Sequence, residues 1–168
     1  VTLDAGTNNA ITFNNTVAST GSARALTLDA GSAEVKFANT VGAGQAMGAI
    51  VITGSLNADA AITAASMTVT GVSDLVGTVI TSGIQTYTGA VTLASAGTEN
   101  RIDASLATFT GGIAGGGNDL DLNGNISTGA AITGAVVTGS VTTCGSTTYL
   151  SNKARFFAPL SGVISNTP

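Results

Sequence analysis

The residues of this chain that could do chemistry are its carboxylates, because histidine is absent. Without an imidazole, serine–histidine or cysteine–histidine nucleophiles and imidazole metal ligation are excluded. A pair of carboxylates still suffices for glycoside hydrolysis. Asp119 and Asp121 lie two residues apart and would share one face of a strand, with Asp103 one coil below. This acidic cluster is the candidate site of a carbohydrate-binding or carbohydrate-cleaving module; the alternative is a set of solvated turn and strand residues.

Two motifs beside the acidic cluster resemble calcium-binding loops, and neither is complete. Residues 119–124 match the first half of an EF-hand loop, but Ala130 stands where a bidentate glutamate must close the calcium shell. Residues 115–119 resemble one calcium-binding nonapeptide of a secreted β-roll, a motif that works only in tandem copies. We therefore expect a glycine-rich corner followed by a strand, with no metal and no cofactor. The single cysteine, Cys144, has no histidine partner and is expected to be unreactive.

Three Thr-x-Thr triplets raise the hypothesis of ice binding, which requires a flat and regular threonine array. The triplets are Thr68/Thr70, Thr86/Thr88 and Thr108/Thr110. If the aromatic residues of the chain face inward, the residues that flank them face outward. The equivalent flanking positions in other repeats include Lys36 and Arg155, which would interrupt the array. The sequence therefore favours ordinary outward-facing strand threonines over an ice-binding face.

All these residues are positioned by an internal repeat. Residues 1–6 return almost unchanged as residues 26–31, and residues 11–17 return as residues 35–41. Self-similarity at such a spacing is typical of stacked units that cannot bury an apolar face alone. Pairs of apolar residues two positions apart recur within the units, and this alternation predicts short strands. The sequence therefore predicts an all-β fold, a parallel β-solenoid.

A bulky residue recurs at about the same spacing and marks the expected core. The series is Phe13, Phe37, Ile62, Tyr87, Phe109, Ile132 and Phe156. Stacked at one position of each coil, these side chains would form an interior ladder; the alternative is a sugar-stacking platform. Glycines at Thr-Gly steps, such as Gly71, Gly89 and Gly111, would supply positive φ at the coil corners. We expect about seven coils of roughly 22–25 residues in all, with continuous solenoid repeats over residues 1–143.

Composition narrows the class of protein. Only 8% of the residues are charged, far below the quarter that is typical of globular domains, and helix-forming residues are scarce. The net charge is −4 and the five basic residues are scattered, which excludes a basic stripe for nucleic acid. No apolar run approaches the ~20 residues of a membrane helix. We therefore expect a β-rich repeat protein that neither binds nucleic acid nor spans a membrane.

The character of the sequence changes at Cys144. The last segment, 144–168, gathers aromatic and basic residues, namely Tyr149, Lys153, Arg155, Phe156 and Phe157. A solenoid must cover the open edge of its last coil, so this segment is expected to be a cap or a subunit-docking tail. The chain also opens inside a repeat unit without a cap signature. This suggests a segment of a larger polypeptide, or a first coil that pairs with the last coil of a neighbour.

The residues of the repeats resemble those of a known group of proteins. Thr-Phe-Asn-Asn-Thr-Val at 12–17, Leu-Thr-Leu-Asp-Ala-Gly at 26–31 and the segment 81–93 look like the degenerate repeats of large bacterial exoproteins of the filamentous-haemagglutinin and autotransporter type. The resemblance covers about residues 1–143 and implies a right-handed parallel β-helix that is secreted or displayed at the cell surface. It implies a non-enzymatic structural protein, either the shaft of an adhesin or a self-stacking fibre subunit. Its partners would be copies of itself, flanking repeats of a larger chain, or host or matrix glycans.

Overall fold

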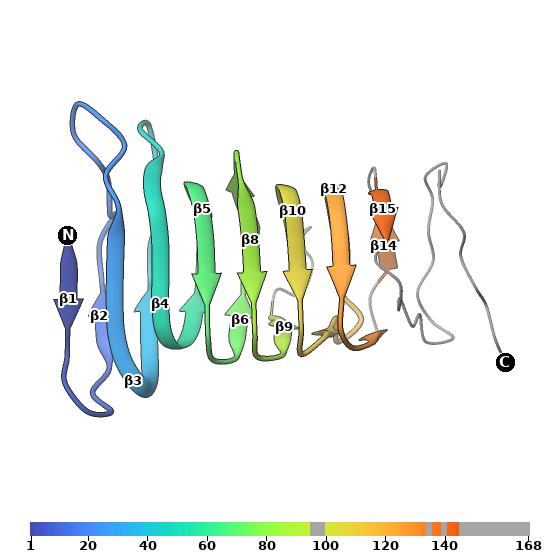
Figure 1. The fold of residues 1–168 in the computed structure, drawn as a ribbon, viewed down its shortest axis with the longest axis horizontal. Coiled ribbons are helices and arrows are strands. Elements are labelled where there is room, and N and C mark those ends of the chain that lie inside the picture. The colour runs from blue at the N-terminus through green and yellow to red at the C-terminus, as the bar shows by residue number, and fades with distance from the viewer. Residues whose placement is uncertain (95–99, 134–135, 139–140, 145–168) are drawn as a thin grey trace, which may run out of the picture.

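The chain folds as a parallel β-solenoid, as the repeat predicts. The structure is a computed structural model, and it describes residues 1–94, 100–133, 136–138 and 141–144. Within these residues the regular elements are all strands, and they stack in parallel into about six turns along one axis (Figure 1). The two ends of the described chain therefore lie at opposite ends of a short rod.

The strands differ in length because some of them run across a corner of the solenoid and others stop at it. In chain order they are β1 (Thr2–Asp4), β2 (Ile11–Phe13), β3 (Leu26–Phe37), β4 (Met47–Ala58), β5 (Ile62–Val69), β6 (Ser73–Leu75), β7 (Thr78–Thr81), β8 (Ile84–Tyr87), β9 (Val91–Leu93), β10 (Asn100–Phe109), β11 (Ile113–Ala114), β12 (Asp119–Thr128), β13 (Ile132–Thr133), β14 (Val136–Thr138) and β15 (Val141–Cys144).

Each turn passes over three faces, which we name by their outward residues. The threonine face carries the register-matched column Thr2, Thr27, Val51, Thr68, Thr86, Thr108 and Ser127. The lysine face carries Thr12, Lys36, Asn57, Asp74, Thr92, Ala114 and Thr133. The arginine face carries Thr78, Arg101 and Asp121. On all three faces neighbouring strands are parallel.

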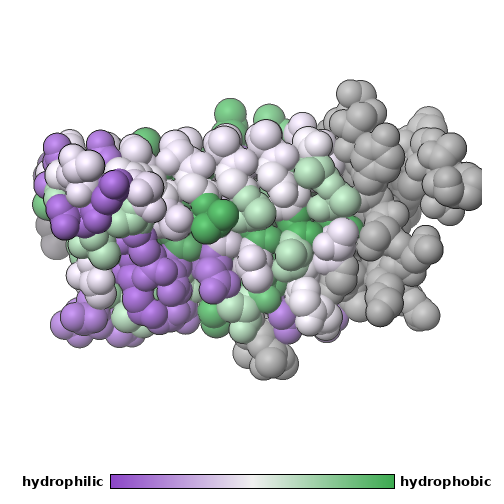
Figure 2. Space-filling view, turned by 90° about the horizontal axis from the view of Figure 1, so that it is seen from below, coloured by the Kyte–Doolittle hydropathy of each residue, from purple (hydrophilic) through white to green (hydrophobic). Residues whose placement is uncertain are grey.

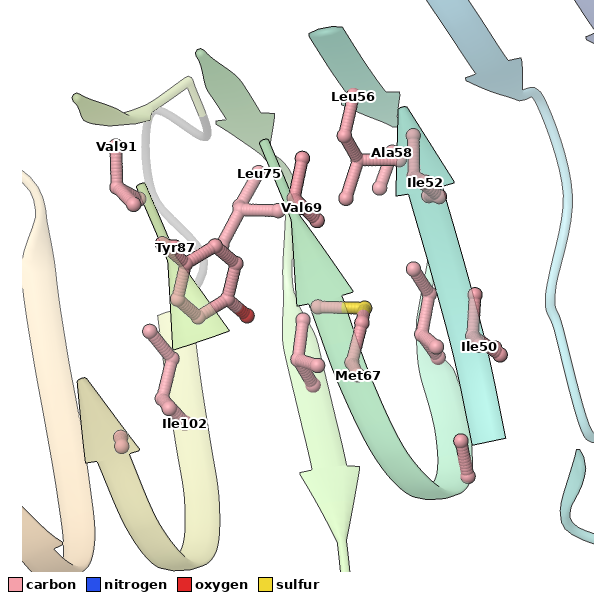
Figure 3. Packing of buried hydrophobic residues seen from close by; sticks show 14 of the residues in the cluster. Ile50, Ile52, Leu56, Ala58, Met67, Val69, Leu75, Tyr87, Val91 and Ile102 are labelled. Carbon is pink, nitrogen blue, oxygen red and sulfur yellow. The ribbon is translucent and has the colours of Figure 1, made fainter. Parts of the chain in front are cut away.

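The core lies between the three faces and is filled by alternate residues of each strand. Buried and more exposed positions alternate along β5, β10 and the longer strands, as expected where one side of a sheet packs inward. One inward column runs through Leu28, Ile52, Val69, Tyr87 and Phe109, all of which are fully buried. Figure 3 shows part of this packing, with the side chains of successive coils pointing into the same interior. The Val-, Ile- and Leu-rich sequence of the strands matches this buried side.

The bulky residues predicted to stack in a single ladder do not all align with one another. They occupy four different inward columns instead of one. Phe13 and Phe37 are stacked at 5.1 Å, and Tyr87 and Phe109 are stacked at 5.1 Å in a second column. Ile62 aligns with Val41 and Val79, and Ile132 aligns with Ile113 and Val91. Phe156 lies outside the described residues.

The cause of this misalignment is that the turns differ in length. One inward column passes through the equivalent residues of successive coils, namely Leu3, Leu28, Ile52, Val69, Tyr87, Phe109 and Thr128. The predicted length of roughly 22–25 residues holds for the first two turns of this column and for the turn that ends at Phe109. The two turns between Ile52 and Tyr87 are several residues shorter, and so is the last one. The differences arise at corners, where the segment 37–47 of one turn corresponds to the shorter segment 58–64 of the next.

The glycines at the Thr-Gly steps serve a different purpose from the one predicted. Gly54, Gly71, Gly89 and Gly111 are stacked above one another at the corner between the threonine and lysine faces. Positive φ occurs at Gly54, but not at the other three. At Gly71 an added Cβ would lie 2.5 Å from the backbone oxygen of Gly54. This corner needs glycine mainly because the backbones of successive coils approach too closely for a side chain.

Candidate functional site

Two of the three predicted acidic residues meet at one arginine. Asp103 on β10 and Asp121 on β12 face the same way as Arg101, and the Arg101 Nη2 atom lies 2.9 Å from Asp103 Oδ2. The Arg101 Nε atom lies 3.8 Å from Asp121 Oδ2, which also accepts a hydrogen bond from Asn123 Nδ2 at 2.9 Å. One guanidinium thus balances two carboxylates in successive coils. That arrangement is typical of an ion pair that holds strands together.

Asp119 lies apart from this pair: among the described residues, its side chain makes no hydrogen bond or ion pair with Arg101, Asp103 or Asp121. It begins β12 in an exposed position, and its backbone oxygen accepts a hydrogen bond from Asn100 Nδ2 at 3.3 Å. Among the described residues there is no group of three or more Asp, Glu, Cys or His side chains that could hold a metal ion. The acidic cluster predicted for carbohydrate chemistry is therefore an arginine-bridged pair plus a separate aspartate, and its role in sugar binding remains a prediction.

Several charged residues of the N-terminal half lie on or beside the lysine face, whereas Asp4 and Asp29 align with Thr53 on the threonine face. Lys36 Nζ lies 2.8 Å from Asp59 Oδ2, and Asn57 Nδ2 donates a hydrogen bond to Glu34 Oε2 at 3.3 Å. The hydrogen bond and the negative charge of Asp59 raise the pKa of Lys36. Figure 2 shows hydrophilic residues gathered toward the N-terminal half of the side seen from below, with white and green surface beyond them. Lys36 and Glu34 thus have partners nearby, whereas Asp74 Oδ1 is buried without a hydrogen-bond partner among the described residues.

The threonine face carries no charge over five turns. Its outward positions there are Ala49, Val51 and Thr53; Ser66, Thr68 and Thr70; Ile84, Thr86 and Thr88; Leu106, Thr108 and Thr110; and Asn125, Ser127 and Gly129. The three Thr-x-Thr triplets singled out from the sequence occupy successive turns of this face and are in register. Lys36, which was expected to interrupt the array, aligns instead with Thr12 and Asn57 on the lysine face. That expectation is therefore corrected.

The inside of the solenoid also contains a polar network that the sequence did not reveal. Gln85 is fully buried, and its amide donates hydrogen bonds to Val79 O at 3.2 Å and Asp103 O at 2.9 Å. Its carbonyl oxygen accepts a hydrogen bond from the Tyr87 hydroxyl at 2.9 Å. Burial raises the pKa of Tyr87 far above its usual range. Ala107 stacks next to Gln85 in the same column, and its small side chain leaves room for the amide.

The first coil leaves its inward residues partly uncovered. Leu3 is 39% exposed, whereas Leu28, at the same position of the next coil, is 0% exposed. Phe13 is half-buried, whereas Phe37 above it is 0% exposed. Within the described residues, β1 and β2 pair on one side only, with β3. The edge of the first coil therefore presents both apolar side chains and unpaired backbone groups.

The predicted assembly residues cannot be placed. Tyr149, Lys153, Arg155, Phe156 and Phe157 lie outside the described residues, as does almost all of the predicted tail. Only the backbone of Cys144 is described, and it ends β15 opposite Ile126.

The chain matches no protein-family model, no curated protein and no solved structure. In the part of the chain that the structure describes, there is also no helix that is long and apolar enough to cross a membrane.

Proposed function

We propose that this chain is a non-enzymatic structural segment, a rod in which coils of one unit stack on coils of the next. The observation that carries the proposal is the uncovered first coil. Its apolar residues Leu3 and Phe13 lie in the same inward columns as the buried Leu28 and Phe37. A further coil placed on this edge would bury them in the same way and would extend the parallel hydrogen bonding.

The backbone of β1 is suited to receive such a coil. Val1 O and the Ala5 amide bond to the second coil, through the Thr27 amide and Asp29 O, each at 2.9 Å. Because alternate residues of a strand direct their backbone groups to opposite sides, Thr2 directs its N–H and C=O toward the open edge. The occupant we propose is a coil of the same kind, either from a second copy of the chain or from flanking repeats of a longer one.

The test is end-to-end assembly of the purified chain, measured by sedimentation and by the length of rods in electron micrographs. Thr2→Pro removes an N–H that this chain does not use for its own β1–β3 pairing, so it should block assembly and leave the solenoid folded. Thr2→Ala keeps the N–H and is the matched control, which should assemble like the parent. Rods of unchanged length with Thr2→Pro would refute stacking through this edge.

The predicted tail is tested separately in the same assay. Removal of residues 144–168 should shorten or abolish the rods if this segment docks on the first coil of a neighbour. Unchanged rods would show that the tail has no docking role.

The surroundings of such a rod are also part of the proposal. The resemblance of residues 1–143 to repeats of large bacterial exoproteins supports a place outside the cell, as the shaft of an adhesin or as a fibre subunit. Antibody labelling of intact cells that make the natural protein would test this, since an intracellular protein is labelled only after lysis.

A further inference from the structure

The threonine face has a regularity that a shaft does not require. Thr68, Thr86 and Thr108 form one outward column, and each is followed two residues later by another outward threonine. The second column, Thr70, Thr88 and Thr110, is held by amide hydrogen bonds to the coil below at 3.1, 3.0 and 2.9 Å. The strands that carry the first column and end one residue before the second, β5, β8 and β10, lie side by side in Figure 1. The two columns therefore form a two-dimensional array.

Five of the six hydroxyl groups of this array are free to meet an external partner. Within the described part of the chain, no hydrogen bond is formed by the hydroxyls of Thr68, Thr86, Thr88, Thr108 and Thr110. Thr70 Oγ1 accepts a hydrogen bond from the Gly54 amide at 3.1 Å, and this bond fixes its orientation at the corner. The exposed side chains of Thr88 and Thr110 lie at the same corner in the following turns.

The array repeats at two fixed spacings. Parallel strands lie ~4.8 Å apart, and residues two apart in extended backbone lie ~6.6 Å apart. Thr70, Thr88 and Thr110 each stand one residue past a strand end, so the second spacing is the strand value extended by one residue. The oxygen atoms on the faces of an ice crystal repeat at closely similar distances in two directions. A threonine offers a hydroxyl that can bond to water and a methyl group that fits between water molecules. A face without charge also avoids the free-energy cost of removing water from charged groups at the contact.

The size of the face argues against a protein partner. Five turns at ~4.8 Å and a strand width of about five residues give an area of roughly 400 Å². A stable protein interface needs about 800 Å² on each partner, so a second copy placed against this face would be held weakly. The face also lacks the aromatic rings that stack on sugars. A crystal face, in contrast, can engage each additional turn of the rod in the same way.

We propose that the threonine face binds ice. The purified full-length chain should slow ice recrystallisation and should be enriched in a slowly growing ice hemisphere. In the double variant T86K/T108K, the two lysines stand in the centre of the array. The concentration needed for the same inhibition should rise by about tenfold or more, the equivalent of losing at least one good contact. Thr86→Val keeps the shape and removes the hydroxyl, so it should give a smaller loss.

Thr92→Lys on the lysine face is the matched control, because Thr92 is also an exposed, outward strand residue. It should keep the parental activity, and circular dichroism should show that every variant remains folded. All measurements are made in the Thr2→Pro background as well, so that ice binding and end-to-end stacking are judged independently. An inactive parent chain would overturn the proposal. So would equal losses in T86K/T108K and Thr92→Lys, or binding of the threonine face to cellulose or chitin but not to ice.

Discussion

The threonine face and the lysine face belong to the same coils, yet they meet water in opposite ways. The inward residues of both are mostly apolar and buried, such as Phe109 behind the threonine face and Leu75 behind the lysine face; Gln85 and Ser73 are buried polar exceptions. Outward, the threonine face is uncharged from Ala49 onward and carries Asp4 and Asp29 in its first two coils, while the lysine face shows Lys36 paired with Asp59. In this solenoid the inward positions therefore determine the fold, whereas the outward positions are free to differ between faces.

The largest expected effect tests the division between inward and outward positions. Phe109→Ala removes a fully buried ring that stacks on Tyr87, and it should lower the free energy of unfolding by about 3–5 kcal/mol. Thr108→Ala, one residue earlier and outward, should change it by no more than about 0.5 kcal/mol. Chemical denaturation of both variants measures the difference. Similar losses in the two would show that Phe109 is not a core residue.

A smaller effect is expected at the corner that separates the two faces. Gly89→Ala would place a methyl group against the backbone oxygen of Gly71, which cannot move without disturbing the coil below. We expect a loss of about 1–3 kcal/mol, as for overpacking in a core. Thr88→Ala, next to it and exposed, is the control and should be nearly neutral. A neutral Gly89→Ala would mean that the coils are not as closely apposed there as the glycine column indicates.

The smallest effect concerns the charges of the lysine face. Asp59 raises the pKa of Lys36, so the ion pair stabilises the folded state below pH 10.5 and this contribution is lost as the pH rises through the higher pKa of the folded state. Lys36→Met should therefore lower the melting temperature slightly at neutral pH and low salt. The difference from the parent should vanish at strongly alkaline pH and in high salt. If the difference in melting temperature depends on neither pH nor salt, the stabilisation comes from packing of the aliphatic part of the Lys36 side chain and not from the ion pair.

The fold could be predicted from the sequence because the first two coils repeat nearly the same residues at almost equal spacing. The register of the later coils could not be predicted, because the next two turns are shorter than the first two. These turns run from Ile52 to Val69 and from Val69 to Tyr87. Counting in equal steps therefore placed Ile62 in the wrong column. The Thr-Gly pairs ending at Gly54, Gly71, Gly89 and Gly111 did carry the true register, since a corner without room for Cβ tolerates little else.

The candidate sites were harder to foresee for the same reason. Lys36 was assigned to the threonine array through the false alignment of Phe37 with Tyr87 and Phe109, which lie in another column. The link between Arg101 and Asp121 depends on which residues face each other in neighbouring coils, whereas Arg101 and Asp103 lie two residues apart on one strand. Such contacts follow from register, and register depends on the length of every preceding turn.

The corners absorb these changes in length while the faces stay in phase. Between Asp29 and Glu34 the second coil holds additional residues opposite Thr53 and Ser55, and the sheet on either side keeps its pairing. A protein engineer could use such a corner as an insertion point for a foreign peptide, since the closure entropy of a surface loop grows by only about 0.6 kcal/mol for each doubling of its length. An epitope inserted between Asp29 and Glu34, where the second coil already holds additional residues, would be displayed at the side of the rod without entering the closely packed glycine column of the later coils.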